Sequence, residues 1–353
     1  MSKTTDIPDL TGLSPKKILL CQQRQIGDVV LATPAIKILQ KEYPESEIHF
    51  LTEKKCVPVL ENNSRITRIW VLDKGASLLE RLRLLWDIRR EKFDLVVDFQ
   101  QLPRCKSAVL FSGAPVRLTY TPKWYNRFVY THWSKMLGGY AVKAKMSVLR
   151  PLGFQWADER PEMVITDAER NCVENFLDEY GVDENEHIVT VDSTHWSDTR
   201  RWPAIHYAGL IDLLVEQRPN LKFVLLYGPG EREQAQAVLD AVHAKEHCIF
   251  PEEQLNIRKT AALMEHACLH LGNCSAPRHF ALAVKTPTFT IIGSNSGRSW
   301  TYPGFDQTYV TLRVECARCQ RNSCQYGTIE CLNEFYPEVV LPLVLKELSV
   351  EPE

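Results

Sequence analysis

The chain alternates short apolar runs with stretches of helical periodicity, and no other feature of the sequence limits its fold as much. The first series is strand 18–21, helix 34–42, strand 47–51, strand 67–72, helix 78–91, strand 94–98, helix 104–112 and strand 116–119. The second is helix 167–180, strand 187–191, helix 204–217, strand 221–227, helix 231–244, strand 247–250, helix 257–266, strand 268–271, helix 276–284, strand 288–292 and a last helix at 336–348. This alternation predicts parallel sheets with helices on both faces, so we expect an α/β fold of two doubly wound, Rossmann-like domains.

The length of the chain supports two domains. A chain of 353 residues, 44% of them hydrophobic, can bury two separate cores. The proline- and charge-rich stretch 151–167 is the expected linker. The expected parts are an N-terminal extension, a first domain, a second domain and a C-terminal helix, at 1–16, 17–160, 167–335 and 336–353.

Charge and composition exclude several classes of protein. A formal net charge of −2 gives no overall attraction to nucleic acid. The first sixteen residues are polar and lack the apolar core of a signal peptide, and no run of about eighteen apolar residues occurs in the chain. We expect a cytoplasmic protein, in which the eleven cysteines are thiols and not a disulfide framework.

One acid lies where such a domain binds its ligands. In the stretch 17–43 an apolar strand is followed by Gly27, Asp28 and a helix. Ligands of open α/β sheets bind at the carboxyl ends of the strands, so Asp28 is a candidate functional acid. The alternative is an aspartate that only caps the helix. Thr33 and Pro34 are expected to be the cap and the first residue of the helix 34–42.

The sequence GDVVLATPAIKILQKEYPESEIHFLT, which begins at Gly27, resembles the opening of the family-9 glycosyltransferases, the ADP-heptose:lipopolysaccharide heptosyltransferases. The resemblance implies the glycosyltransferase B fold, two Rossmann-like domains facing a cleft. It also implies that Asp28 is the catalytic base, that no cofactor is needed, and that the C-terminal helix returns toward the first domain. KILQKEYPESEIHFLTEKK and FDLVVDFQ are similar to the branch that adds a side heptose, which points to a heptosyltransferase III-like member.

The loop after strand 187–191 carries a basic pair. The sequence TRRWP at 199–203 resembles the family's Lys-Arg-Trp-Pro element, in which a cation meets the donor diphosphate. Arg200 takes the lysine position, and its forked donors suit phosphate. Arg201 and the Thr194 hydroxyl are further expected donor contacts. The alternative is a basic pair on the surface.

The next strand ends in Gly-Pro-Gly-Glu at 228–231, before another helix. The glycines allow a ligand to approach the backbone, and Glu231 is similar to a family glutamate that suits sugar or ribose hydroxyls. An ordinary turn with an acid at the start of a helix explains the same residues.

A third donor element is LGNCSAPRH at 271–279, which resembles the family signature Gly-Asn-Asp-Ser-Gly-Pro-x-His. The helix start, with a serine near its cap, is an expected site for the donor's pyrophosphate. The residues expected to contact the donor are Asn273, Cys274, Ser275, Ala276 and His279. His279 is otherwise a core histidine. Cys274 replaces the family's aspartate and Ala276 its glycine, and because that aspartate is associated with sugar hydroxyls, the donor sugar stays open.

The segment between Asp98 and Asp158 contains no acid, nine basic residues and several aromatic ones. Such a surface suits an anionic sugar, with aromatic faces covering the sugar rings. The residues expected to bind the acceptor are Arg104, Lys123, Trp124 and Arg127. A groove for single-stranded nucleic acid and contact with an anionic membrane are the alternatives.

Four cysteines form one cluster, Cys316, Cys319, Cys324 and Cys331. Their spacing fits no common zinc finger, so we expect a loop of structural thiols, with a structural zinc as the alternative. No Asp-x-Asp occurs in the chain, so a metal-bridged diphosphate is not indicated.

The resemblance implies an inverting, metal-independent transferase that moves heptose from ADP-L-glycero-D-manno-heptose to the inner core of lipopolysaccharide. The expected partners are this or a related nucleotide sugar, the anionic core acceptor, and the cytoplasmic face of the inner membrane; nucleic acid is not expected. One alternative is a transferase of the same fold that uses another nucleotide sugar. The other is a catalytically silent protein that binds glycolipid or nucleic acid.

Overall fold

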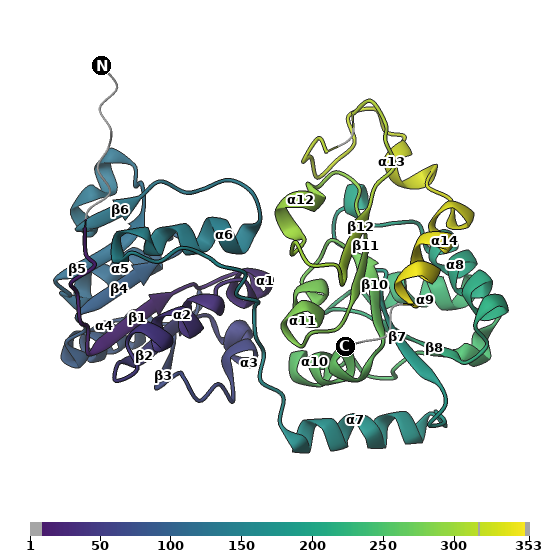
Figure 1. The fold of residues 1–353 in the computed structure, drawn as a ribbon, viewed down its shortest axis with the longest axis horizontal. Helices are drawn as coiled ribbons and strands as arrows, with labels where there is room; N and C mark the ends of the chain where they lie inside the picture. The colour runs from purple at the N-terminus through teal and green to yellow at the C-terminus, as the bar shows by residue number, and fades with distance from the viewer. Residues whose placement is uncertain (1–8, 317, 350–353) are drawn as a thin grey trace. The chain divides into compact units, whose positions relative to one another are not determined.

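The computed structural model describes residues 9–316 and 318–349, and the chain divides into two compact units between Val164 and Ile165 (Figure 1). Each unit contains one six-stranded sheet in which all neighbouring strands are parallel. This confirms the predicted α/β class. Residues 1–8 of the expected N-terminal extension and residues 350–353 of the expected C-terminal segment lie outside the described residues.

The sheet of the first unit has the order β3-β2-β1-β4-β5-β6. Its strands are β1 (Lys17–Cys21), β2 (Glu47–Thr52), β3 (Arg68–Val71), β4 (Leu95–Asp98), β5 (Val116–Tyr120) and β6 (His132–Ser134). The helices are α1 (Ile26–Val30), α2 (Pro34–Glu42), α3 (Val57–Leu60), α4 (Leu78–Glu91), α5 (Pro103–Ser112) and α6 (Ala141–Met146).

The central strand β1 is apolar because the sheet is covered on both faces. Ile18, Leu19 and Leu20 are all fully buried. On one face, Leu19 belongs to the same core as Ile88 of α4 and Val109 of α5. Polar residues therefore occur only at the amino end of β1, with Lys17, and beyond its carboxyl end, where Asp28 follows.

The sheet of the second unit has the order β12-β11-β10-β7-β8-β9. Its strands are β7 (His187–Asp192), β8 (Leu221–Leu226), β9 (Cys248–Ile249), β10 (Leu269–Asn273), β11 (Thr288–Ile291) and β12 (Gln307–Val310). The helices are α7 (Asp167–Glu179), α8 (Ala204–Gln217), α9 (Arg232–Ala241), α10 (Ile257–His266), α11 (Pro277–Ala283), α12 (Gly297–Trp300), α13 (Glu330–Asn333) and α14 (Pro337–Glu347).

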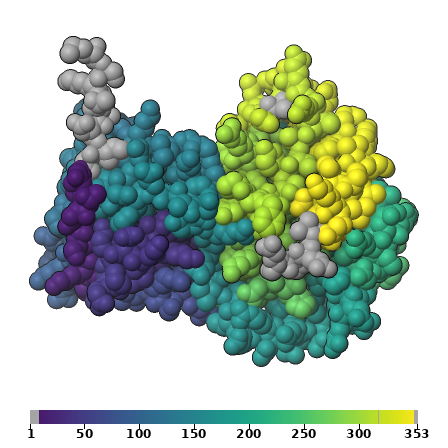
Figure 2. All heavy atoms as spheres, in the orientation of Figure 1, coloured from purple at the N-terminus to yellow at the C-terminus, as the bar shows by residue number. Residues whose placement is uncertain are grey.

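The C-terminal helix α14 is part of the second unit. It packs on α8, and Val340 and Val344 are buried in the same core as Trp202. The indole Nε1 of Trp202 donates a hydrogen bond of 2.8 Å to the carbonyl of Phe335, just before α14. In the space-filling view α14 forms part of the surface of this unit (Figure 2).

Two strands were not predicted, and each forms one edge of a sheet. β6 has three residues and β12 has four, and both have a polar composition, so neither produces the apolar run that indicates a buried strand. The predicted helix 231–244 ends at Ala241, and the predicted strand 247–250 is reduced to Cys248–Ile249.

Thr33 occupies the N-cap position of α2, as the sequence predicted, but its side chain makes no capping hydrogen bond. Its backbone is itself helical, and its hydroxyl donates to the carbonyl of Val30 at 2.7 Å. The same hydroxyl accepts a hydrogen bond from the amide of Glu162 at 2.9 Å. Pro34 does begin α2, because its missing amide hydrogen is not needed in the first turn.

Among residues 9–316 and 318–349, no helix combines the length and the apolar character that crossing a bilayer requires.

The centre of β10 contains a histidine that the fold keeps neutral. His270 is fully buried, and its Nδ1 lies 3.0 Å from the hydroxyl of Thr190 on β7. Burial, with a smaller effect of the Arg278 charge, lowers the pKa of His270 to about 3. The unfolded chain, in which the pKa is about 6.5, therefore takes up this proton first as the pH falls. The stability contributed by a neutral His270 is present above pH 6.5 and is lost between pH 6.5 and pH 3.

We predict that His270→Gln reduces the loss of stability in acid. At pH 5 the neutral histidine costs the wild type about 2 kcal/mol relative to pH 8, and glutamine removes this cost while keeping a polar atom for Thr190. Urea unfolding at pH 8 and pH 5 measures the difference. His187→Gln, at the exposed start of β7, is the control and should keep the wild-type pH dependence. An equal loss of stability in wild type and His270→Gln would contradict the prediction.

Candidate functional site

Asp28 lies in α1, directly beyond the carboxyl end of β1. It is the third residue of α1 and forms a capping box with Gln25, whose amide donates to Asp28 Oδ2 at 3.3 Å. The capping alternative is therefore realised. The side chain is still 31% exposed, so it has access to solvent.

A lysine that sequence reasoning missed holds the other oxygen of Asp28. Lys145 Nζ on α6 lies 2.9 Å from Asp28 Oδ1 and donates a hydrogen bond of 3.1 Å to Gln22 Oε1. The Lys145 side chain is only 12% exposed, so its charge is screened less than that of a fully exposed lysine. Lys145 belongs to the basic segment, but nothing in the local sequence indicates which of its nine cations would reach Asp28.

Arg104 also lies at the carboxyl edge of the first sheet, but its charge is already paired. Its Nη2 bonds to Glu53, which is buried and follows the end of β2. Its Nη1 is a buried donor with no hydrogen-bond partner among the described residues. The structure therefore gives Arg104 a structural ion pair and leaves one donor for a ligand.

The other predicted acceptor residues lie on an exposed turn. The 3-10 helix Trp124–Val129 exposes Trp124 by 79%, and Lys123 and Arg127 are exposed beside it. Arg127 lies over the ring of Trp133 on β6, 5.6 Å from its centroid. This turn offers cations and aromatic faces to solvent, and the predicted binding of an acceptor there stays a prediction.

At the carboxyl edge of the second sheet, the two arginines after β7 have different surroundings. Arg201 pairs with Asp198 and donates to the carbonyl of His195 at 2.9 Å. Arg200 Nε is buried and has no hydrogen-bond partner in the described part of the chain. The hydroxyl of Ser193 is in the same condition. Arg201 therefore supports the loop, whereas Arg200 and Ser193 have capacity for a ligand.

Four side chains from three loops meet beside them. Glu231, before α9, accepts from the Thr194 hydroxyl at 2.8 Å and from the amide of Gly228 at 3.2 Å. The Thr194 hydroxyl also lies 3.2 Å from Oδ1 of Asp192, the last residue of β7. Ser275 bonds to Oδ2 of Asp192 and so does not cap α11. Asp192 was not predicted, because at the end of an apolar strand it carries no motif.

The other residues of the 273–279 element lie inside the fold. Asn273 is fully buried, and its Oδ1 accepts from the amide of Trp202 at 3.0 Å and from the hydroxyl of Tyr207 at 3.1 Å. His279 is buried with its ring centroid 6.2 Å from that of Trp300. The Asn273 side chain thus joins β10 to α8.

Cys274 and Ala276 stand between these buried residues. Cys274 is half-buried, and its sulfur accepts from Nη1 of Arg278 at 3.5 Å. Ala276 precedes α11 in a helical conformation that any residue adopts, so the family's glycine is not required by the backbone here.

The four clustered cysteines line one cavity of about 210 Å³. The same segment is bonded to the Arg200 loop, because the hydroxyls of Ser197 and Thr199 donate to the carbonyls of Asn322 and Arg321 at 2.8 and 2.7 Å. The cysteine segment therefore supports the loop that carries Arg200.

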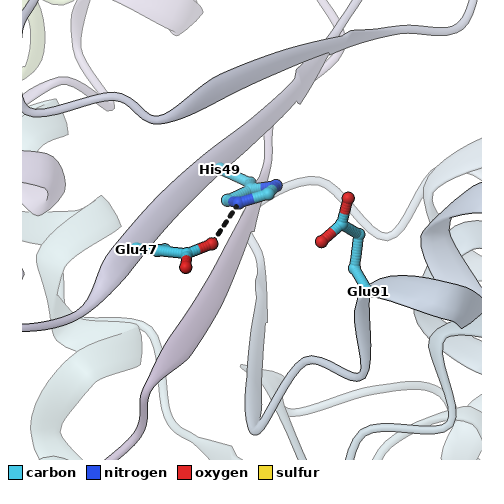
Figure 3. Close-up of side chains that lie close together, drawn as sticks. All are labelled: Glu47, His49 and Glu91. Atoms are coloured by element: carbon cyan, nitrogen blue, oxygen red, sulfur yellow. Dashed lines mark ion pairs between the residues drawn. The ribbon is translucent and has the colours of Figure 1, made fainter.

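Among the described residues, one group of side chains has its potential metal ligands within 4.8 Å of one another, Glu47, His49 and Glu91 (Figure 3). The carboxylates are already paired, since Lys17 Nζ lies 3.2 Å from Glu47 and 2.9 Å from Glu91. His49 Nδ1 accepts from the indole of Trp70 at 3.0 Å, so a neutral ring has its proton on Nε2. An ion-pair network at the amino edge of the first sheet explains this group.

The chain belongs to glycosyltransferase family 9 (heptosyltransferase), whose family model matches residues 81–330. The family resemblance of the sequence is thereby confirmed, and so is the expectation of a transferase. The fold of the two units is the glycosyltransferase B fold of solved family members.

Individual relatives agree with this assignment. The chain is 28% identical to lipopolysaccharide heptosyltransferase 3 of Escherichia coli (strain K12) over 299 residues, 78% of this chain and 82% of that protein. The structure of the family-9 glycosyltransferase of Veillonella parvula DSM 2008 matches with a TM-score of 0.83 at 21% identity, over 94% of this chain and 97% of that one. An Escherichia coli heptosyltransferase with ADP-2-deoxy-2-fluoro heptose matches with a TM-score of 0.71 at 14% identity, over 94% and 99%.

We predict that Asn273→Ala destabilises the protein by about 2 to 4 kcal/mol, because it leaves the Trp202 amide and the Tyr207 hydroxyl buried without their acceptor. Urea unfolding measures the loss. Asn185→Ala, on the exposed surface of the same unit, is the control and should cost less than about 0.5 kcal/mol. Wild-type stability combined with lost nucleotide binding in Asn273→Ala would instead give this side chain a direct role with the ligand.

Proposed function

We propose that this protein is an inverting heptosyltransferase that moves heptose from ADP-L-glycero-D-manno-heptose to the inner core of lipopolysaccharide, as a heptosyltransferase III-like member of its family. The family membership, the identity to a lipopolysaccharide heptosyltransferase 3, and the fold shared with a heptosyltransferase that binds an ADP-heptose analogue support the proposal. A reaction on the cytoplasmic face of the inner membrane is part of it.

The observation that carries the proposal is Asp28, a fixed and partly exposed carboxylate at the ligand edge of the first sheet. In the proposed reaction the acceptor hydroxyl transfers its proton to Asp28 while its oxygen bonds to the anomeric carbon of heptose. The bond from that carbon to the ADP oxygen breaks, and ADP departs with the electron pair. A positioned general base of this kind contributes about 10²–10⁴-fold to a rate.

Lys145 fits this role as a positioning residue. An ammonium 2.9 Å from one carboxylate oxygen and the Gln25 amide on the other leave Asp28 a single orientation. A base must lie within hydrogen-bond distance of the proton it removes, so a fixed orientation favours transfer.

We assign the donor to the second unit. Arg200 Nε and the Ser193 hydroxyl are buried without partners, which costs free energy unless a ligand accepts their hydrogens. A diphosphate supplies such acceptors, and a guanidinium stabilises the charge that develops on departing ADP. Glu231 is oriented by Thr194 and Gly228 for sugar or ribose hydroxyls.

We assign the acceptor to the first unit, which contains Asp28. Lys123 and Arg127 attract core phosphates and sugar carboxylates, and Trp124 offers a face for a sugar ring. The same exposed turn is the proposed contact with an anionic membrane surface.

We predict that Asp28→Asn lowers turnover about 100-fold or more while ADP-heptose binding changes less than about twofold, because asparagine keeps the capping geometry but cannot take the proton. Mass spectrometry of the product from ADP-heptose and a lipopolysaccharide precursor measures turnover, and calorimetry measures binding.

Asp87→Asn, exposed on α4, is the matched control and should keep full activity. Near-normal turnover of Asp28→Asn would exclude Asp28 as the base. Because Cys274 replaces the family's aspartate, ADP-glucose, UDP-sugars and GDP-sugars are screened beside ADP-heptose by thermal shift. Stabilisation by another nucleotide sugar and not by ADP-heptose would show that the proposed donor is wrong.

We predict that replacing Lys123 and Arg127 together by alanine raises the Michaelis constant for the acceptor and leaves ADP-heptose binding within about twofold. Screening limits such charge contacts to about 10 Å at 0.1 M salt, so the wild-type Michaelis constant should also rise with salt, and more steeply than that of the variant. Steady-state kinetics at two salt concentrations tests both statements.

The control is Lys41→Ala with Arg90→Ala, which removes two exposed cations from the last turns of α2 and α4, at the amino edge of the sheet. Acceptor kinetics should not change in this variant. Weaker donor binding with unchanged acceptor kinetics in the Lys123 and Arg127 variant would refute the division of labour between the units.

A further inference from the structure

Two carboxyl groups at the carboxyl edge of the second sheet share a single hydroxyl. The Thr194 hydroxyl oxygen lies 2.8 Å from Glu231 Oε2 and 3.2 Å from Asp192 Oδ1. A hydroxyl has one proton to donate, so it satisfies only one of two ionised carboxylates. When both acids are ionised, the Thr194 oxygen and the carboxylate oxygen that receives no proton face each other with lone pairs, which is repulsive. A proton on one of the acids makes both contacts hydrogen bonds, because that acid then donates to the threonine oxygen.

Asp192 has the surroundings of an acid that keeps a proton. It is 3% exposed, and no ion pair to it is present in the part of the chain that the structure describes. Burial raises the pKa of Asp192 to about 7, and the charge of Glu231 adds to this, against hydrogen bonds from Ser275 and Thr194. A buried carboxylate without a cation is costly to ionise.

The other titratable groups around Asp192 keep one charge state near neutral pH. Tyr207 on α8 donates to the Asp192 carbonyl at 3.4 Å, and burial holds its pKa well above the usual range. Asp192 and His270 both lie beside Gly272 of β10, and the pKa of His270 is about 3. The charged and titratable side chains of the neighbouring loops include Glu231, His195 and Arg200, with Arg201 paired to Asp198, and burial lowers the pKa of His195. Of these groups, Asp192 is therefore the one that titrates near pH 7.

This pair lies among the residues assigned to the donor. Thr194 and Arg200 follow β7, Glu231 precedes α9, and Ser275 follows β10, so Asp192 connects all three loops through its two oxygens. A nucleoside diphosphate adds negative charge to these loops. Each ionised carboxyl group nearby opposes that charge, and at short range in a poorly solvated site the repulsion is substantial.

We propose that Asp192 is a positioning residue of the donor site, and that this site binds a nucleoside diphosphate when the carboxyl group of Asp192 is protonated. The affinity for the donor should therefore fall as the pH rises past neutrality. The inference rests on the proposed donor class. A neutral Asp192 keeps the hydrogen bonds of Thr194 and Ser275, orients Glu231 through Thr194, and adds no charge beside the diphosphate. Ionisation of Asp192 breaks one of these contacts and repels the ligand.

The test compares ADP-heptose binding to wild type and Asp192→Asn by calorimetry between pH 6 and pH 8.5, a range in which the diphosphate diester has no titrating group. Asparagine is neutral at every pH and keeps hydrogen-bonding atoms. We expect the dissociation constant of the wild type to rise at least fivefold across this range and that of Asp192→Asn to change less than twofold. The same pH dependence in both proteins overturns the inference.

If Asp192→Asn does not fold, a measurement on the wild-type protein tests whether donor binding requires a protonated Asp192. At pH 8, calorimetry in buffers of different ionisation enthalpy should show uptake of a large fraction of one proton per ADP-heptose bound. Zero uptake overturns the inference. Asp98→Asn is the matched control, since Asp98 is a buried acid at the end of β4 in the first unit. It should keep the wild-type pH dependence of binding.

Failure of the proposed function and failure of the inference about Asp192 give different results. If no nucleotide sugar binds at any pH, the proposed function fails and this inference with it. If ADP-heptose binds equally well at pH 6 and pH 8.5, the donor class stands and the role of Asp192 is refuted. A purely structural role for Asp192 would lower stability in the asparagine variant without changing the slope of affinity against pH.

Discussion

Both sheets are parallel and covered by helices on both faces, and the rest of the structure depends on this burial. The interior of β1 is apolar, and charged side chains lie near the ends of the strands, where the chain leaves the sheet. Asp28 follows β1, Glu53 follows β2, and Asp192 ends β7. The residues assigned to the proposed reaction therefore lie at the carboxyl edges of the sheets.

The two edges hold their acids in opposite ways. Asp28 is partly exposed and paired with Lys145, whose ammonium fixes the orientation of the carboxylate. Asp192 is buried among hydroxyls, with a second acid one hydroxyl away, which favours a carboxyl group that keeps its proton. In the proposed mechanism the surroundings, and not the residue type, decide which acid serves as a base and which as a neutral support.

The sequence could predict those features that neighbouring residues encode, and not those that depend on contacts between distant parts of the chain. The bounds 34–42, 78–91, 204–217 and 257–266 agree with α2, α4, α8 and α10, because periodicity, prolines and caps lie within each segment. Asp28 and Arg200 were found through motifs of neighbouring residues. Lys145 and Asp192 were missed because their partners are distant in the sequence, and the structural role of Asn273 depends on Trp202, which only the folded chain brings to it.

The shortness of the outermost strands has a consequence for the protein in a crowded cell. The four strands at the borders of the sheets, β3, β6, β9 and β12, have two to four residues each, and β3 begins with Arg68. A border strand exposes unpaired amide and carbonyl groups that a strand of another molecule can join. With so few such groups at each border, intermolecular strand addition gains little, and the two sheets resist growth into aggregates.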